Sequence, residues 1–287
     1  MATTDQEFSI EQLCISAVKA SIEAGRAILR HYPGNYSIEY KEDKSPLTSA
    51  DNQSHQVISE HLAQTGIPVL SEEGRNIPYA ERSQWNRFWL VDPLDGTKEF
   101  INQNGEFTVN IALIEGFTPV IGVIYIPVTG VLYFATSETG SFRSTIDHKI
   151  TNPETATFSE LIKLSVKLPL LKDRPVTIIG SRSHQNPENT ALIQKISAFY
   201  KNVQVVNVGS SLKFCRLAEG SADYYPRIGP TMEWDTAAGD AIARYSGAKV
   251  INYYSHQALL YNKENLLNPP FIVITEEHYK KFINSSA

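Results

Sequence analysis

The sequence predicts an α+β first half, residues 1–150, followed by an α/β second half, residues 151–287. In the first half, three β-rich runs follow one another with glycine and proline in the turns, which is typical of an antiparallel meander. In the second half, β-rich runs alternate with helical patterns, which indicates separate layers of strands and helices. A length of 287 residues suits one large domain or two closely packed halves.

The first half is expected to open with a helix, because apolar residues recur at helical spacing from Ile10 to Ile28. A charged loop at residues 41–46 precedes a second helix that begins at Thr48. Short strands are expected at residues 67–70 and 88–91, and a short helix follows at residues 97–101. The meander then covers residues 107–114, 120–126 and 131–136, and residues 145–157 form the seam between the halves.

The second half repeats the alternation of strand and helix to its end. Gly220 and Gly247 are expected to close two of its helices. The strands are expected at residues 176–179, 203–208, 222–225, 249–253 and 271–275. The helices are expected at residues 189–200, 210–219 and 236–245, and from residue 276 onward.

Composition excludes several classes of protein. With 42% hydrophobic and 20% charged residues the chain is not expected to be disordered. A net charge of −5 argues against binding a nucleic-acid polymer, although bound cations could still create a site for a small anion. We find no secretory signal and no membrane-spanning run, so we expect a cytoplasmic protein, with peripheral association at the inner face of the cell membrane left open. Cys14 and Cys215 are expected to be buried thiols.

The segment DPLDGT at residues 92–97 carries the clearest chemical signal. Asp92 and Asp95 follow an apolar strand, and Pro93 and Gly96 favour a tight turn that aims both carboxylates at one point. Two such anions repel each other unless a hard cation lies between them. The helix that begins at Thr97 would present its first amides to a phosphate. This arrangement indicates metal-assisted hydrolysis of a phosphate ester.

Other acidic residues could complete this site, and each has a simpler alternative. Glu72, with Glu73, follows a strand and is either a solvated loop residue or a further ligand of the cation. Asp235 is either a helix N-cap or a residue that reaches the strand ends. Asp51 is either half of a capping box with Thr48 or a carboxylate that helps Thr97 deprotonate a water molecule. Three carboxylates and a backbone carbonyl suit Mg²⁺.

Four polar residues of the second half follow predicted strands: His184, Ser210, Lys213 and Arg227. Their shared position predicts a second anion pocket, in which the lysine and the arginine would pair with a phosphate. The alternatives are solvated surface cations and, for Ser210, a helix cap.

The sequence lacks the motifs of several other enzyme classes, among them P-loop nucleotide triphosphatases, dinucleotide oxidoreductases, zinc proteases and α/β-hydrolases. The haloacid dehalogenase-like phosphatases use DxDGT and form an aspartyl-phosphate, whereas the spacing here is DxxDGT, one residue longer. That class stays as a rival. A non-catalytic module that binds phosphorylated nucleotides is a second rival.

Taken together, these motifs resemble those of the inositol monophosphatase-like superfamily of Mg²⁺-dependent, lithium-sensitive phosphatases. Within it, the chain resembles the CysQ-type 3′(2′),5′-bisphosphate nucleotidases. DPLDGT and WDTAAG, at residues 92–97 and 234–239, are specific for the superfamily. KEF, SRSH and GSSLKF, at residues 98–100, 181–184 and 209–214, point to the nucleotidase branch. The resemblance extends from the first helix to Phe271.

The resemblance implies one domain over residues 1–287, a layered αβαβα sandwich of the inositol monophosphatase/fructose-1,6-bisphosphatase type. It implies two or three Mg²⁺ ions, held by Glu72, Asp92, the carbonyl of Leu94, Asp95 and Asp235. The implied catalytic residues are Asp51, Thr97 and Glu72. The implied substrate contacts are Leu94, Asp95, Gly96, Thr97, His184, Ser210, Lys213, Arg227 and Asp235.

The implied reaction is hydrolysis of the 3′-phosphate of 3′-phosphoadenosine 5′-phosphate to AMP and phosphate during sulfate assimilation. An activated water would attack, with no covalent enzyme intermediate. Inositol monophosphate or another sugar phosphate of the same superfamily is the alternative substrate. The expected partner is therefore a small phosphorylated nucleotide, and the protein is expected to be a monomer or a homodimer.

Overall fold

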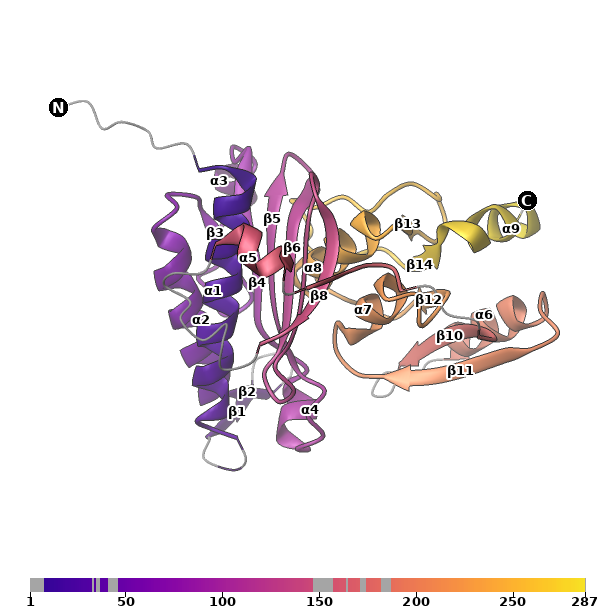
Figure 1. Ribbon diagram of the computed structural model, residues 1–287, viewed down its shortest axis with the longest axis horizontal. Helices are drawn as coiled ribbons and strands as arrows, with labels where there is room; N and C mark the ends of the chain where they lie inside the picture. The colour runs from indigo at the N-terminus through magenta and orange to yellow at the C-terminus, as the bar shows by residue number, and fades with distance from the viewer. Residues whose placement is uncertain are drawn as a thin grey trace.

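The computed structural model describes residues 8–32, 34, 37–40, 46–146, 157–163, 165–170, 174–181 and 187–286. These residues form two large sheets, a separate two-stranded sheet, and three layers of helices around the two large sheets (Figure 1). One outer layer covers the first sheet, a middle layer lies between the sheets, and the other outer layer covers the second sheet. The outer layers are α1 (Ile10–Leu29) with α2 (Ser49–Ala63), and α6 (Pro187–Ser197) with α9 (Glu276–Ser286); the middle layer is α7 (Leu212–Ala218) with α8 (Glu233–Tyr245). The predicted αβαβα sandwich is confirmed.

The first sheet has seven strands in chain order. Its first two strands are parallel, and every later pair is antiparallel. The strands are β3 (Val69–Ser71), β4 (Arg87–Asp95), β5 (Thr108–Glu115), β6 (Thr118–Ile126), β7 (Val131–Thr136), β8 (Gly140–Thr145) and β9 (Val166–Lys167). The predicted meander is confirmed. The sequence analysis missed β8 and β9 because β8 is mostly polar and β9 has only 2 residues.

The second sheet has five strands in the order β11-β10-β12-β14-β13. Its β10 pairs in parallel with β11 and β12, whereas β14 is antiparallel to both of its neighbours. The strands are β10 (Val176–Ser181), β11 (Val203–Val208), β12 (Tyr224–Arg227), β13 (Ala248–Asn252) and β14 (Phe271–Thr275). All five were predicted, with ends that differ by a few residues.

The remaining described elements are short. They are β1 (Ile38–Tyr40), β2 (Pro46–Thr48), α3 (Tyr79–Arg82), α4 (Thr97–Ile101) and α5 (Phe158–Lys163). Of the predicted charged loop, residues 41–45 lie outside the described residues, as do residues 147–156 of the predicted seam. The division into halves stays a prediction. In the structure, β9 joins the first sheet and α8 packs against strands of both sheets.

The middle layer approaches the first sheet closely. A Cβ atom at Gly122 of β6 would overlap the carbonyl oxygen of Ala238 and lie 2.7 Å from the Cβ of Ala241, both on α8. Glycine at this position therefore lets the helix backbone rest on the strand. On the opposite face, α1 buries its apolar side against the same sheet, and its Cys14 is buried, as is Cys215 of α7.

Among the described helices, none is both long enough and apolar enough to cross a lipid bilayer. The expected cellular location and the expected monomeric or homodimeric state stay predictions.

Candidate metal and phosphate site

The strand that carries the two motif aspartates continues further than predicted. We expected it to end at residue 91, but β4 runs to Asp95 and pairs with β5 along its length. Its register shifts from Asp92 opposite Asn110 to Asp95 opposite Thr108, so two residues of β4 oppose one of β5. This is a bulge, in which the missing N–H of Pro93 costs no ladder hydrogen bond. The bulge, rather than a turn after the strand, sets the spacing of the two carboxylates.

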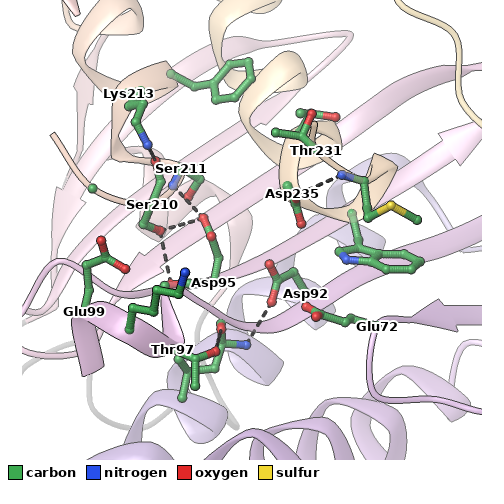
Figure 2. Close-up of a pocket in the computed structure, with 18 of the residues that line it drawn as sticks. Glu72, Asp92, Asp95, Thr97, Glu99, Ser210, Ser211, Lys213, Thr231 and Asp235 are labelled. Carbon is green, nitrogen blue, oxygen red and sulfur yellow. Dashed lines mark hydrogen bonds between the residues drawn. The ribbon is translucent and has the colours of Figure 1, made fainter. Parts of the chain in front are cut away.

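Three carboxylates from three elements converge beside this bulge. Glu72 follows β3, whose parallel pairing with β4 places Ser71 opposite Val91, and the Glu72 amide donates to the Val91 carbonyl at 3.1 Å. Asp235 lies in the first turn of α8. One oxygen each of Glu72, Asp92 and Asp235 lies within 4.8 Å of the other two. Figure 2 shows these side chains around one space.

Asp235 is not the N-cap of its helix, so that alternative was wrong. The helix begins three residues earlier than predicted, with Met232 at the N-cap and Asp235 at the third helical position. There its Oδ2 accepts a hydrogen bond from the Met232 amide at 2.8 Å. The carboxylate thus stabilises the start of α8 and still reaches the acidic cluster.

The electrostatics of the cluster favour a bound cation. Burial, and then the charges of Glu72, Asp95, Asp235 and Asp51, raise the pKa of Asp92 far above its ordinary value. Burial, and then the charges of Asp95 and Glu72, raise the pKa of Asp235 to about 8. Without a cation, the cluster therefore holds protons that a free aspartate would release at neutral pH. Converging carboxylate oxygens, from the buried Asp92 and the partly buried Glu72 and Asp235, are a donor set that fits a hard divalent cation such as Mg²⁺.

Asp95 lines one cavity together with Glu72, Asp92 and Asp235, but it does not belong to the group of three carboxylates that converge. Its Oδ2 accepts hydrogen bonds from the Ser210 hydroxyl at 2.6 Å, the Ser211 amide at 2.6 Å and the Asn110 side chain at 3.3 Å. The hydroxyl of Ser210 therefore points at Asp95 (Figure 2). Ser210 has a positive φ of 50° and precedes the N-cap residue Ser211, so the capping alternative for Ser210 was wrong.

Asp51 makes the capping contact and also contacts Thr97, while its part in activating water stays a prediction. Its Oδ2 accepts from the Thr48 amide at 2.8 Å, which is the capping contact at the start of α2. Its Oδ1 accepts from the Thr97 hydroxyl at 3.3 Å. The same hydroxyl lies 3.5 Å from the Leu94 carbonyl oxygen. Asp51 is 2% exposed and therefore buried.

The cavity between the motifs has a volume of about 330 Å³. Acidic residues line one side, and the start of α4, with Gly96 at φ +93° and then Thr97, lies beside them. Lys213 and Arg227 also line it. The Lys213 ammonium donates to the Ser210 carbonyl at 2.9 Å, and burial lowers its pKa to about 8. The buried Nε of Arg227 makes no hydrogen bond to any described residue.

One predicted site residue, His184, lies outside the described residues. The structure also brings residues to the site that the sequence analysis gave no role, chief among them Thr108, Asn110 and Ser211. The sequence does contain a signal for two of them. Thr108 and Asn110 are polar residues at the start of a strand whose middle is apolar, and because they are two positions apart they lie on one face of it. The other unpredicted lining residues are Lys98, Glu99, Gly209, Phe214, Tyr225, Thr231, Met232, Trp234 and Thr236.

Known proteins are similar in sequence to this chain over almost its whole length. The profile of the inositol monophosphatase family matches residues 9–286. The 3′(2′),5′-bisphosphate nucleotidase CysQ of Salmonella typhimurium is 43% identical over 268 residues, which cover 92% of this chain and 98% of that protein. The protein of the same name from Escherichia coli K12 is 40% identical over the same shares of the two chains.

Solved structures share the fold. The crystal structure of CysQ from Bacteroides thetaiotaomicron, described as a bacterial member of the inositol monophosphatase family, superposes with a TM-score of 0.86. It is 44% identical in sequence, and the match covers 94% of this chain and 99% of that one.

Proposed function

The chain belongs to the inositol monophosphatase family, and from this premise we propose that it is a 3′(2′),5′-bisphosphate nucleotidase. The proposed reaction is hydrolysis of the 3′-phosphate of 3′-phosphoadenosine 5′-phosphate to AMP and phosphate. The observation that carries the proposal is one cavity with an acidic cluster on one side and two buried cations, Lys213 and Arg227, in its lining. Relatives of this name, 40–43% identical over 92% of the chain, support the choice of substrate.

In this proposal Glu72, Asp92, the Leu94 carbonyl, Asp95 and Asp235 hold two or three Mg²⁺ ions. The converging carboxylates of the cluster fit such ions, since they repel one another, and Asp92 and Asp235 retain protons without the ions. When bound, Mg²⁺ supplies positive charge for the phosphate oxygens and increases the acidity of water.

The chain itself would position the substrate and move the proton. The amides of Gly96 and Thr97 bind the phosphate that is cleaved, next to the acidic cluster. Asp51 accepts a proton by way of the Thr97 hydroxyl, with which it is already hydrogen bonded at 3.3 Å. Lys213 and Arg227, together with Ser210 and His184, bind the nucleotide and its second phosphate. No covalent enzyme intermediate is part of this scheme.

A substrate panel tests the proposal. Phosphate release is measured from 3′-phosphoadenosine 5′-phosphate, 3′-AMP, 5′-AMP, inositol 1-phosphate and fructose 1,6-bisphosphate, with Mg²⁺ varied and Li⁺ added. We expect the bisphosphorylated nucleotide to give the highest kcat/KM, only with Mg²⁺, and Li⁺ to inhibit. 3′-AMP should have a higher KM because it lacks the second phosphate, and 5′-AMP should release none.

Two results would contradict the proposal. A higher kcat/KM for either sugar phosphate would favour another activity of the same family. Intact nucleotide after long incubation with Mg²⁺ would favour a binding protein.

A further inference from the structure

A buried polar network lies behind Asp95, between β5 and the residues that precede α7. Thr108 and Asn110 on β5 are 0% and 1% exposed, and Ser211 at the N-cap of α7 is 3% exposed. The Thr108 hydroxyl oxygen lies 2.7 Å from the Ser210 hydroxyl, 2.8 Å from the Ser211 hydroxyl and 3.0 Å from the Asn110 Oδ1. The Ser211 hydroxyl also donates to the Asn110 Oδ1 at 2.8 Å.

The direction of these hydrogen bonds follows from the carboxylate. An ionised Asp95 can only accept, so the Ser210 hydroxyl, the Ser211 amide and the Asn110 Nδ2 all donate to its Oδ2. This fixes the orientation of the Asn110 amide, whose Oδ1 then faces the hydroxyls of Thr108 and Ser211. The one proton of the Ser210 hydroxyl lies toward Asp95, so the Ser210 oxygen can only accept in its 2.7 Å contact with Thr108. Thr108 in turn has a single proton, which it shares between the Ser210 oxygen and the Asn110 Oδ1. Thr108 thus contacts all three residues that donate to Asp95.

The network has a geometric consequence for the cation site. Three donors converge on a single oxygen of Asp95, which fixes the plane of the carboxylate and leaves Oδ1 as the oxygen available to a cation. The same bonds join β4 and β5 of the first sheet to the turn between β11 and α7. These hydrogen bonds therefore determine the position of Asp95 relative to the group formed by Glu72, Asp92 and Asp235, to which Asp95 does not belong.

We propose that Thr108, Asn110 and Ser211 are positioning residues that, together with the Ser210 hydroxyl contacted by Thr108, hold Asp95 in the orientation in which it binds its cation. The inference rests on the proposed function. None of the three needs to touch the substrate, since each acts through the Asp95 carboxylate. Residues that orient metal ligands in this way commonly change metal affinity or activity by roughly 10- to 100-fold when they are replaced.

The test replaces the hydroxyl at the centre of the network. Thr108→Val has nearly the same shape but cannot donate, whereas Thr108→Ser keeps the hydroxyl and serves as the rescue variant. Thr136→Val is the matched control, because Thr136 is also 0% exposed and lies on β7 of the same sheet, with its hydroxyl bonded to Thr139. Mg²⁺ binding to the substrate-free protein is measured by titration calorimetry, and kcat and KM are measured with 3′-phosphoadenosine 5′-phosphate.

We expect Thr108→Val to raise the Mg²⁺ Kd and to lower kcat, each by about 10-fold, with little change in the KM of the nucleotide. Thr108→Ser and Thr136→Val should resemble the wild type. Thermal unfolding in EDTA shows whether each variant is folded. If Thr108→Val does not fold, Ser210→Gly removes a direct donor to Asp95 without backbone strain, since φ there is +50°. The same rise in Kd is then expected.

The inference would be overturned if the folded Thr108→Val variant bound Mg²⁺ with wild-type affinity. If Ser210→Gly is used in its place, wild-type affinity in that variant would have the same meaning. An equal loss in Thr136→Val would also overturn it, because the effect would then be general to the sheet. If the wild-type protein releases no phosphate from the nucleotide, the proposed function fails. The calorimetric comparison of the variants still decides the role of the network in that case.

Discussion

At the scale of single residues, Asp51 shows how one carboxylate can serve two elements. Helix capping and proton acceptance were alternatives in the sequence, because residue spacing does not distinguish the two oxygens of a side chain. In the structure Oδ2 accepts from the Thr48 amide and Oδ1 accepts from the Thr97 hydroxyl. The capping contact and the contact with Thr97 therefore coexist in one side chain, and mutation can test whether the second one serves catalysis.

We expect Asp51→Asn to lower kcat by about 10²- to 10⁴-fold, because an amide does not accept a proton from Thr97. Its carbonyl oxygen can still accept from the Thr48 amide, so the loss in unfolding free energy should stay below about 2 kcal/mol. Steady-state kinetics and urea unfolding measure the two effects.

The matched control is Ser9→Ala, which removes the capping box of α1 far from the cavity. It should cost about 1 kcal/mol of stability and leave kcat unchanged. If Asp51→Asn behaved like this control, Asp51 would be a helix cap alone.

At the scale of elements, α8 decides where Asp235 stands. The helix lies between the two sheets, and its backbone rests on Gly122 of β6. Its first turn then reaches the part of β4 that carries Asp92. The position of a proposed metal ligand thus depends on a glycine in a different element.

Gly122→Ala should move α8 away from the first sheet, because the new Cβ would overlap the Ala238 carbonyl. We expect a loss of about 1–3 kcal/mol in unfolding free energy. We also expect weaker Mg²⁺ binding, since Asp235 shifts relative to Asp92 and Glu72. Urea unfolding and titration calorimetry measure the two changes.

Gly25→Ala is the control for this experiment. A Cβ at Gly25 of α1 would lie 2.5 Å from the Tyr125 ring, on the opposite face of the same sheet. It should lower stability while Mg²⁺ affinity is retained. Equal losses of affinity in both variants would show that the site responds to sheet stability and not to the position of α8.

The elements themselves were largely predictable, because their signals are local. The periodicity of α1 and the apolar runs of β5, β6 and β7 correspond closely to the structure. The end of β4 was not predictable, since the proline and glycine of residues 93–96 indicated a turn. Pairing with Thr108 extends the strand instead. The start of α8 was missed because nothing in the sequence marks Glu233 as a helical residue. In the structure its carboxylate accepts hydrogen bonds from the amides of Asn262 and Lys263, which are distant in sequence.

At the scale of the whole molecule, the buried acidic cluster links folding, pH and metal binding. Folding of the metal-free protein raises the pKa of Asp92, and raises that of Asp235 from 3.8 to about 8. At these two residues the folded state therefore binds more protons than the unfolded state, and their contribution to stability falls as pH rises from the unfolded to the folded pKa values. Bound Mg²⁺ would displace those protons and reverse the trend.

We expect the Tm of the protein in EDTA to fall as pH rises from about 4 to about 8. Saturating Mg²⁺ should raise the Tm most at the upper end of this range, with release of protons that calorimetry in buffers of different ionisation enthalpy detects. Asp235→Asn should flatten the pH dependence in EDTA. A metal-free Tm that rises over this range would contradict the assignment.

By itself, the sequence determined the order of most helices and strands and the residue types of a phosphate-ester hydrolase, because periodicity and motif spacing are local properties of the chain. Only the tertiary structure decided which oxygens meet. Glu72 directly follows β3, Asp92 lies on β4 and Asp235 lies on α8. Their convergence depends on strand register and on the approach of a helix to a sheet. The support of Asp95 by Thr108, Asn110 and Ser211 was likewise beyond the sequence, since those contacts join residues about a hundred positions apart.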